Sequence, residues 1–210
     1  MLRIIMKSIM GGICIGIGGI VNLMSSNAIV GAFLFSIGLL TIISNSFLLY
    51  TGQVGYLGTK KDRNLGYLFL TIVTWAGNFI GCFAVAKIIS LTRIYPMIYD
   101  KVNSIVEIKM NDAPISIFIL SIFCGILMYV AVDGNRECIK KGMYVTAVAL
   151  IILPVVVFIL SGFEHVVANM FYFSLANALS FDVFKLILIM SAGNAIGAML
   201  FPYIKEMKEV

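Results

Sequence analysis

Long runs of apolar residues fill most of this chain, and short polar segments separate them. A helix needs about 20 apolar residues to cross the hydrocarbon core of a bilayer, because each residue advances it by about 1.5 Å. The runs predict six transmembrane spans, at about 4–23, 28–50, 65–90, 114–132, 143–173 and 181–203. The fifth run is too long for one plain crossing, which indicates an interrupted helix.

The composition agrees with a lipid environment. Hydrophobic residues make up 61% of the 210 residues, charged residues make up 12%, and the mean hydropathy is +1.05. A soluble domain is closer to half apolar and a quarter charged. Because the apolar runs are continuous and do not alternate every second residue, they favour helices over a β-barrel. We therefore predict an all-α membrane protein in which residues 1–210 form a single transmembrane domain.

The basic residues are unevenly distributed between the two ends of the predicted spans. Ten of the fifteen fall on one side: Arg3, Lys7, Lys60, Lys61, Arg63, Arg136, Lys140, Lys141, Lys205 and Lys208. The positive-inside rule then predicts that both termini are cytoplasmic. The net charge of +5 is interpreted as topology and contact with lipid headgroups. No basic stripe is interleaved with aromatic residues, so nucleic acid is not an expected partner.

The longest polar segment connects the third and fourth predicted spans. It carries six charged side chains: Arg93, Asp100, Lys101, Glu107, Lys109 and Asp112. We predict that it begins as an interfacial helix and then crosses the face of the bundle. A flexible link is the alternative.

One short motif occurs twice, about half the chain apart. Gly77–Gly81 reads Gly-Asn-Phe-Ile-Gly, and Gly193–Gly197 reads Gly-Asn-Ala-Ile-Gly. Each copy closes a group of three predicted spans, so the two groups (repeat A, about 1–90, and repeat B, about 112–204) should be inverted relative to each other. Inverted repeats with interrupted helices are typical of transporters and channels. The alternative is a pair of Gly-x-x-x-Gly helix contacts.

The predicted interruptions fall at matching places in the two repeats. Gly52 and Gly55 loosen the second span, and Ser161 and Gly162 loosen the fifth. Thr51 precedes Asn78 by about the distance that separates His165 from Asn194. We therefore predict that Thr51 and His165 are symmetry mates that face each other near the midplane, and that Asn78 and Asn194 support the interrupted segments from behind.

Glu164 and His165 are adjacent ionisable residues at membrane depth, and His165 is the only histidine. Such residues are costly in lipid and usually line a cavity or the interior of the bundle. His165 has an ordinary pKa near 6.5, which suits it to exchange protons near neutral pH. We predict that Glu164 caps the free N–H groups of the following half-helix. A purely structural, hydrogen-bonded histidine is the alternative.

The residues around His165 resemble the formate/nitrite transporter family. Gly162–Met170 is similar to that family's signature Gly-Phe-Glu-His-x-x-Ala-Asn-Met, and Asn169 is the asparagine of this motif. Leu49-Tyr50-Thr51 looks like the family's Leu-Phe-Thr, and Gly193–Gly197 looks like its Gly-Asn-x-x-Gly. The resemblance covers essentially the whole chain at the level of six spans.

The resemblance implies an aquaporin-like protomer, a homopentamer in the prokaryotic inner membrane, and a pore for small monovalent anions of weak acids. It assigns Thr51 and His165 to the pore centre, where His165 exchanges a proton with the anion. It further implies apolar constrictions, assigned to Leu49 with Tyr50 and to Phe158, for which helix packing is the alternative, and a basic vestibule residue, for which Lys109 is the candidate. As a hypothesis, Lys109, Lys101 and the half-helix starts gather anions at the mouth. Formate, nitrite, hydrosulfide, acetate and lactate form the substrate class.

The chain departs from the family pattern at three positions. The family's fourth helix often reads Gly-Ile-Leu-Cys-Asn, whereas Gly125 here begins Gly-Ile-Leu-Met-Tyr, which replaces the asparagine by Tyr129. Tyr50 replaces a phenylalanine and adds a hydroxyl where the family is apolar. Lys109 lies about one helical turn farther from Gly125 than the resemblance implies.

Three other classes of function remain open at the level of sequence. A neutral-solute pore is one, although none of the four prolines follows an asparagine as aquaporin motifs require. A non-conducting membrane protein that senses pH through His165 is another. An intramembrane enzyme is disfavoured, because one histidine cannot form a His-Glu-x-x-His zinc site and no aspartate is placed to complete a Ser-His protease pair. The four cysteines lack metal-ligand spacing, so no metal, cofactor or disulfide is expected.

Overall fold

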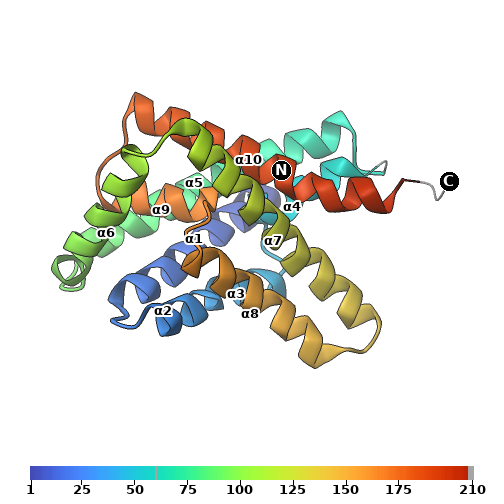
Figure 1. The fold of residues 1–210 in the computed structure, drawn as a ribbon, viewed down its shortest axis with the longest axis horizontal. Coiled ribbons are helices and arrows are strands. Elements are labelled where there is room, and N and C mark those ends of the chain that lie inside the picture. Colours follow the sequence, from blue (N-terminus) through green and yellow to red (C-terminus); the bar gives the residue numbers. More distant parts are fainter. Residues whose placement is uncertain (60, 208–210) are drawn as a thin grey trace.

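The structure is a computed structural model that describes residues 1–59 and 61–207, and within these residues it contains helices and no strand (Figure 1). The predicted all-α class is therefore confirmed. Two of the lysines used to predict orientation, Lys60 and Lys208, lie outside the described residues.

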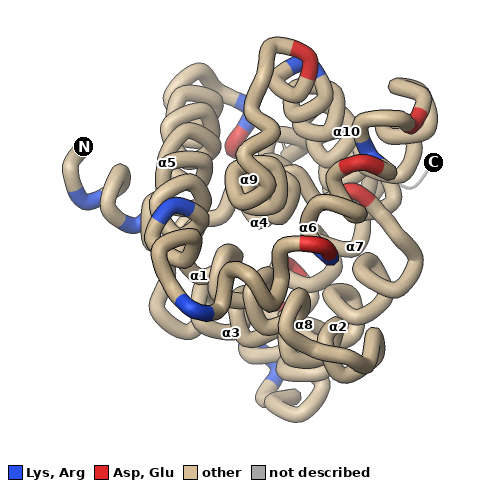
Figure 2. The backbone as a smooth tube through the Cα atoms, turned by 90° about the vertical axis from the view of Figure 1, so that its left-hand side faces the viewer, with Lys and Arg blue, Asp and Glu red and all other residues tan. Residues whose placement is uncertain are grey.

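Four described helices are long and apolar enough to cross a membrane: α1 (Leu2–Met24), α5 (Leu65–Ser90), α7 (Pro114–Lys140) and α10 (Phe181–Lys205). The shorter elements are α2 (Ala28–Phe35), α3 (Ile37–Ser44), α4 (Tyr50–Gln53), the 3-10 helix η1 (Val54–Gly58), α6 (Tyr95–Met110), α8 (Tyr144–Leu160) and α9 (Val166–Leu175). Charged residues lie mainly near helix ends and in the connecting segments (Figure 2).

The chain leaves the helical conformation at two matching places inside the bundle. Residues 45–49 separate α3 from α4, and residues 161–165 separate α8 from α9. Each segment contains a residue with positive φ, Ser46 at 53° and Gly162 at 68°. A left-handed residue ends a helix abruptly, because it turns the backbone away from the helical path. Both segments end at a new helix start within the apolar core.

Two close helix pairs form the frame of the bundle. α1 packs against α5, and α7 packs against α10, through glycines that leave no room for a side chain. A Cβ on Gly12 would collide with the carbonyl oxygen of Asn78, and a Cβ on Gly125 would collide with that of Asn194. The same backbone contact is thus made once in each half of the chain, and it places Asn78 and Asn194 in the centre.

One predicted boundary needs correction. The fourth span was predicted to end at residue 132, but α7 continues to Lys140. Its last two turns are polar, and Lys140 pairs with Glu137 at 2.6 Å, so this part of the helix is stable beyond the apolar stretch.

The polar segment 91–112 contains α6, which buries Ile98, Val102 and Val106 along one face. This spacing is that of an amphipathic helix.

We predict that Gly125→Ala destabilises the protein by about 1–3 kcal/mol, because the added methyl group must push the α10 backbone away. Gly134→Ala is the matched control, since its Cβ would meet only the end of the Leu150 side chain, at 3.0 Å. Thermal midpoints of the detergent-solubilised variants, measured by size-exclusion chromatography after heating, check the prediction. Equal midpoints for the two variants would contradict it.

Candidate functional site

His165 and Thr51 meet at the centre of the bundle. His165 is the N-cap residue of α9, and its Nδ1 accepts the Ala168 N–H at 3.1 Å. Its Nε2 lies 2.8 Å from the Thr51 Oγ1. Because Nδ1 accepts a hydrogen bond, the neutral ring carries its proton on Nε2 and donates it to Thr51. The Thr51 hydroxyl hydrogen can then be donated to a ligand. Both side chains are buried, with 2% and 1% of their surfaces exposed.

Aromatic and apolar side chains surround this polar pair. Phe158 stacks on the His165 ring with centroids 5.4 Å apart and meets Phe35 edge-on at 5.8 Å. Leu49, which directly precedes α4, is 2% exposed. The hydroxyl of Tyr50 donates to the Ser191 carbonyl oxygen at 3.0 Å. The polar atom by which Tyr50 departs from the family pattern is therefore bonded to the neighbouring helix.

The carboxamides of Asn78 and Asn194 bind the two interrupted segments in the same way. Asn78 Oδ1 accepts the Tyr50 N–H at 2.8 Å, and its Nδ2 donates to Leu48 O at 2.9 Å. Asn194 Oδ1 accepts the Val166 N–H at 2.9 Å, and its Nδ2 donates to Glu164 O at 2.8 Å. Each Nδ2 also reaches a serine carbonyl on the partner helix, at 2.7 Å in both halves: Ser8 and Ser121.

These bonds correct the predicted symmetry of the site. They pair Tyr50 with Val166, so the counterpart of His165 in the first half is Leu49, not Thr51. Thr51 and His165 face each other although their positions in the two repeats differ by two residues. One interrupted helix thus contributes a hydroxyl from inside its half-helix, whereas the other contributes an imidazole from its cap.

Glu164 does not cap α9, contrary to the prediction. Its carboxylate accepts the Lys109 Nζ at 2.7 and 2.6 Å and the Asn169 Nδ2 at 2.7 Å. His165 Nδ1 caps the helix instead, because it is the side chain of the N-cap residue that lies closest to the free N–H groups. Glu164 and His165 point to different partners, as expected for adjacent residues.

The two lysines expected to gather anions are both bonded to the protein. Lys109 lies at the end of α6 and forms the ion pair with Glu164, in which the side chains are 14% and 6% exposed. Lys101 Nζ donates to the carbonyl oxygens of Asn22 at 2.8 Å and Ser25 at 2.9 Å. Partial burial lowers the pKa of Lys101. Neither ammonium group extends freely into solvent.

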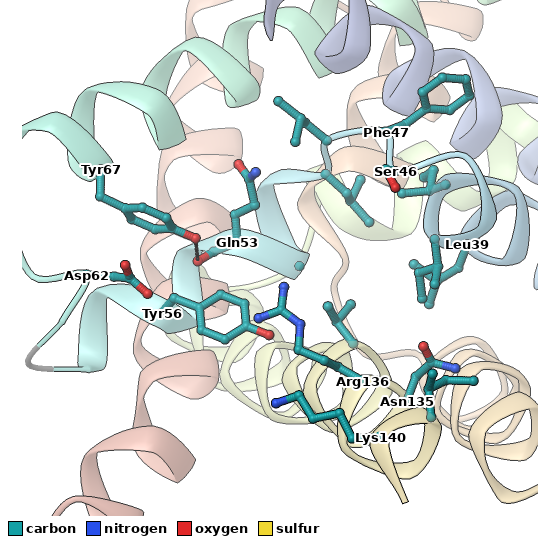
Figure 3. A pocket seen from close by; sticks show the side chains of 17 residues that line it. Leu39, Ser46, Phe47, Gln53, Tyr56, Asp62, Tyr67, Asn135, Arg136 and Lys140 are labelled. Atoms are coloured by element: carbon teal, nitrogen blue, oxygen red, sulfur yellow. Dashed lines mark hydrogen bonds between the residues drawn. The ribbon is translucent and has the colours of Figure 1, made fainter. Parts of the chain in front are cut away.

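A cavity of about 560 Å³ reaches the interrupted segment between α3 and α4 (Figure 3). Its inner lining includes Leu39, Leu49, Gly52 and Val132, and its outer lining includes Tyr56, Arg136 and Lys140. His165, Tyr50 and Phe158 do not line it. The cavity therefore reaches Leu49, Gly52 and Gln53, the neighbours of Tyr50 and Thr51 in the chain, but not these two residues themselves.

Sequence reasoning missed several residues of this site. Tyr50 bonds to Ser191, whose Oγ accepts the Trp75 Nε1–H at 2.9 Å, and Phe35 packs on Phe158. These contacts join residues that are far apart in sequence, so no local pattern indicates them. Ser8 and Ser121 could have been found from the sequence. The inverted repeat places each of them one helical turn before the glycine that contacts Asn78 or Asn194. Among the described residues, no group of three His, Cys, Asp or Glu side chains could hold a metal ion.

Comparisons with known proteins agree on one family. A family profile described as "Formate/nitrite transporter" matches residues 1–205. The chain is 30% identical to the formate-nitrite transporter of Plasmodium knowlesi, covering 72% of this chain and 52% of that protein. It is 30% identical to the formate channel FocA of Haemophilus influenzae, covering 68% of this chain and 52% of that protein. The chain thus spans about half the length of these relatives.

Two solved structures have the same fold. One is described as an FNT family ion channel, with a TM-score of 0.81 and 22% identity over 97% of this chain and 88% of that one. The other is described as a pentameric formate channel with formate bound, with a TM-score of 0.81 and 20% identity over 97% of this chain and 95% of that one. At this identity, the likeness shows the fold.

We predict that Asn194→Ala strongly lowers stability, because it leaves the Val166 N–H and the Glu164 carbonyl without their partner in an apolar core. Each buried group left unpaired costs about 1–3 kcal/mol. Asn103→Ala is the matched control, since its Nδ2 makes one exposed bond to Tyr99 O. The thermal midpoint in detergent should fall for Asn194→Ala alone, and a fall of the same size in the control would argue against the assigned role.

The Lys109–Glu164 pair gives a second prediction. Lys109→Gln leaves the Glu164 carboxylate buried without a counter-charge and should cost about 3–5 kcal/mol. The double substitution Lys109→Gln with Glu164→Gln removes both charges and should restore much of the loss. Thermal midpoints of the wild type, both single variants and the double variant form the required cycle. Additive losses would show that the two charges do not stabilise each other.

Proposed function

Because this chain belongs to the formate/nitrite transporter family, a family of transporters and channels and not of enzymes, we propose that it conducts small monovalent anions of weak acids across a membrane. Its long apolar helices make it an integral membrane protein. Formate, nitrite and hydrosulfide are the proposed substrates, with acetate and lactate in the same class. The observation that carries the proposal is the Thr51–His165 contact between two interrupted helices.

The centre of the pore offers two hydrogen-bond donors to an anion. The Thr51 hydroxyl hydrogen is free to donate to an anion, whereas the His165 Nε2–H is bonded to Thr51 Oγ1 at 2.8 Å and becomes a second donor when it turns from Thr51 to the anion. A bare anion in an apolar passage is costly to desolvate, and charge-assisted hydrogen bonds offset part of that cost. We infer that Thr51 and His165 hold the anion during its passage.

The proposed proton step takes place between His165 and the bound anion. Protonation of Nδ1 breaks its bond to the Ala168 N–H and gives an imidazolium whose two nitrogens both carry protons. The Nε2–H bond then breaks as an O–H bond (an S–H bond for hydrosulfide) forms on the anion, which leaves a neutral weak acid and a neutral ring with its proton on Nδ1. Loss of that proton from Nδ1 and return of a proton to Nε2 restore the starting ring. The neutral acid crosses the apolar side chains of Leu49, Tyr50 and Phe158 at much lower cost than the anion.

The Lys109–Glu164–Asn169 group supports this centre from the side. Glu164 directly precedes His165, and the three hydrogen bonds to its carboxylate hold that stretch of backbone. The Asn169 Nδ2 also donates to His165 O at 3.0 Å. We propose that Lys109 contributes positive charge near the path while Glu164 keeps it in place. The buried Asn169 Oδ1 lacks a hydrogen-bond partner among the described residues and can accept one from water.

The arrangement of the membrane spans follows the same two halves of the chain. We propose one transmembrane domain of six spans, with repeat A at about 1–90 and repeat B at about 112–204, in which the second and fifth spans are interrupted. The matched bonds of Asn78 and Asn194 support this inverted repeat. We further propose a homopentamer with one pore in each protomer, both termini on the cytoplasmic side, and a prokaryotic inner membrane as its location.

The test is uptake of labelled formate or nitrite into proteoliposomes between about pH 5 and pH 7. Wild-type uptake should rise towards acid pH, because more imidazolium is available to protonate the anion. His165→Phe and Thr51→Ala should each lower uptake by about 10- to 100-fold, the value of a hydrogen bond to a charged group. Swelling assays with neutral solutes separate this function from a neutral-solute pore.

The matched control is Thr74→Ala. Thr74 is also buried, but its hydroxyl donates to Leu70 O within its own helix at 2.9 Å, so its loss should leave uptake unchanged. Wild-type protein that takes up no anion at any of these pH values would sink the proposed function. Full uptake by His165→Phe would remove the proton step while leaving the pore.

A further inference from the structure

Arg136 lies at the mouth of the cavity that Leu49, Gly52 and Gln53 line at its inner end. It lies on the last part of α7, is exposed, and belongs to the cavity lining. Its guanidinium carbon lies 5.0 Å from the centre of the Tyr56 ring. Figure 3 shows the side chain extending from α7 towards Tyr56 and Gln53. Among the described residues, none accepts a hydrogen bond from the guanidinium or pairs with it.

Neighbouring side chains hold the aromatic surface on which Arg136 rests. The Tyr56 hydroxyl donates to Asp133 Oδ1 at 3.3 Å, and Lys205 Nζ donates to Asp133 Oδ2 at 2.9 Å. The Tyr56 ring also meets Tyr129 edge-on, with centroids 5.9 Å apart. Stacking on an aromatic face leaves the edges of a guanidinium free to donate. Lys205 meanwhile offsets the Asp133 charge, which would otherwise compete for Arg136.

The other polar groups of the lining are largely occupied. Lys140 pairs with Glu137 at 2.6 Å, and the Asn135 Nδ2 donates to Ala147 O at 3.0 Å. Asp62 is a carboxylate in the lining, and it lies on the far side of Tyr56 from Arg136 in Figure 3. Arg136 is therefore the cation in the described lining whose N–H donors have no protein partner.

A second polar group in the cavity also lacks a partner. The Gln53 Oε1 is buried and accepts no hydrogen bond within the described residues. Gln53 is the last residue of α4, the half-helix that carries Thr51. A carboxamide oxygen accepts hydrogen bonds, so Gln53 Oε1 can accept one from the water that accompanies a small oxyanion. The cavity thus offers polar groups both at its mouth and beside the pore centre.

From these contacts we propose that Arg136 forms an anion-binding subsite for planar oxyanions, such as carboxylates and nitrite, at this mouth of the pore. The inference rests on the proposed function, because it assigns the place where the anion waits before Leu49. A guanidinium binds two oxygens of a planar anion with two parallel N–H donors. Hydrosulfide has a single acceptor atom and cannot match that geometry. Arg136 therefore favours planar oxyanions over hydrosulfide.

The experiment measures uptake of labelled formate by right-side-out and inside-out membrane vesicles from cells that produce the full chain. Arg136→Gln should raise the half-saturating formate concentration about tenfold in one vesicle orientation and leave the maximal rate unchanged. Arg136→Lys keeps the charge but loses the paired donors, so the preference for formate over hydrosulfide in competition should fall. An unchanged half-saturation in both orientations would overturn the subsite.

Arg63→Gln is the matched control, because it removes the same charge from a residue that does not line this cavity. An equal rise in half-saturation for Arg63→Gln would show a general surface-charge effect and overturn the proposal. A direct measurement is phenylglyoxal modification of the wild type, followed by mass spectrometry. Formate should slow modification of Arg136 and not of Arg63, and equal rates with and without formate would also overturn it.

The same measurements distinguish a failure of the proposed anion transport from a failure of the proposed Arg136 subsite. If wild-type vesicles take up no formate while formate still protects Arg136 from phenylglyoxal, the proposed transport function is wrong and the binding subsite stands. If uptake is normal and Arg136 shows neither protection nor an effect of substitution, the subsite is wrong and the transport function stands.

Discussion

The centre of this protein depends on the hydrogen bonds that the buried carboxamides of Asn78 and Asn194 make to the two interrupted segments. A chain that leaves the helix inside an apolar bundle exposes N–H and C=O groups that neither lipid nor apolar side chains can satisfy. Each carboxamide satisfies one donor and one acceptor of an interrupted segment and ties that segment to a second helix. The close glycine contacts between α1 and α5 and between α7 and α10 bring the carboxamides within reach. Without this support, Thr51 and His165 would have no fixed positions.

The two halves of the chain repeat the same helix contacts and backbone hydrogen bonds, but they carry different polar side chains. The bonds of Asn78 and Asn194 are equivalent atom for atom, yet the counterpart of His165 is Leu49. The second half carries the imidazole and the Lys109–Glu164 pair, whereas the cavity opens against the interrupted segment of the first half. A polar centre therefore lies between an ion pair and a cavity whose mouth carries Arg136. The two halves thus share a backbone arrangement but carry different polar groups.

Each polar atom at the centre either has a hydrogen-bond partner in the protein or lies where a ligand could provide one. The Tyr50 hydroxyl is bonded to Ser191, so its ring presents apolar carbon despite the extra oxygen. The His165 Nδ1 is bonded to Ala168, which directs the remaining ring proton towards Thr51. Among the described residues, the groups without a protein partner include the Thr51 hydroxyl hydrogen, the Gln53 and Asn169 carboxamide oxygens and the Arg136 guanidinium. In a low-dielectric interior such unused groups are costly, which favours positions along a hydrated path.

The sequence by itself determined the helical class, the long apolar helices and the family, because hydrocarbon thickness demands long apolar runs and the motif at Gly162–Met170 is specific. It also located the break before His165, since Gly162 has a positive φ. In the first half, the chain leaves the helix at residues 45–49, with a positive φ at Ser46, whereas the predicted Gly52 and Gly55 lie inside α4 and η1. Tertiary structure alone decided that Glu164 pairs with Lys109 and that His165 caps α9. It also decided that α7 continues to Lys140 and that a cavity reaches Leu49, Gly52 and Gln53. The ion pair and the cavity depend on distances between residues that are far apart in sequence, about which helical periodicity carries no information. The cap of α9 and the end of α7 involve residues three apart, His165 with Ala168 and Glu137 with Lys140, and there the folded chain decided which polar side chain makes each contact.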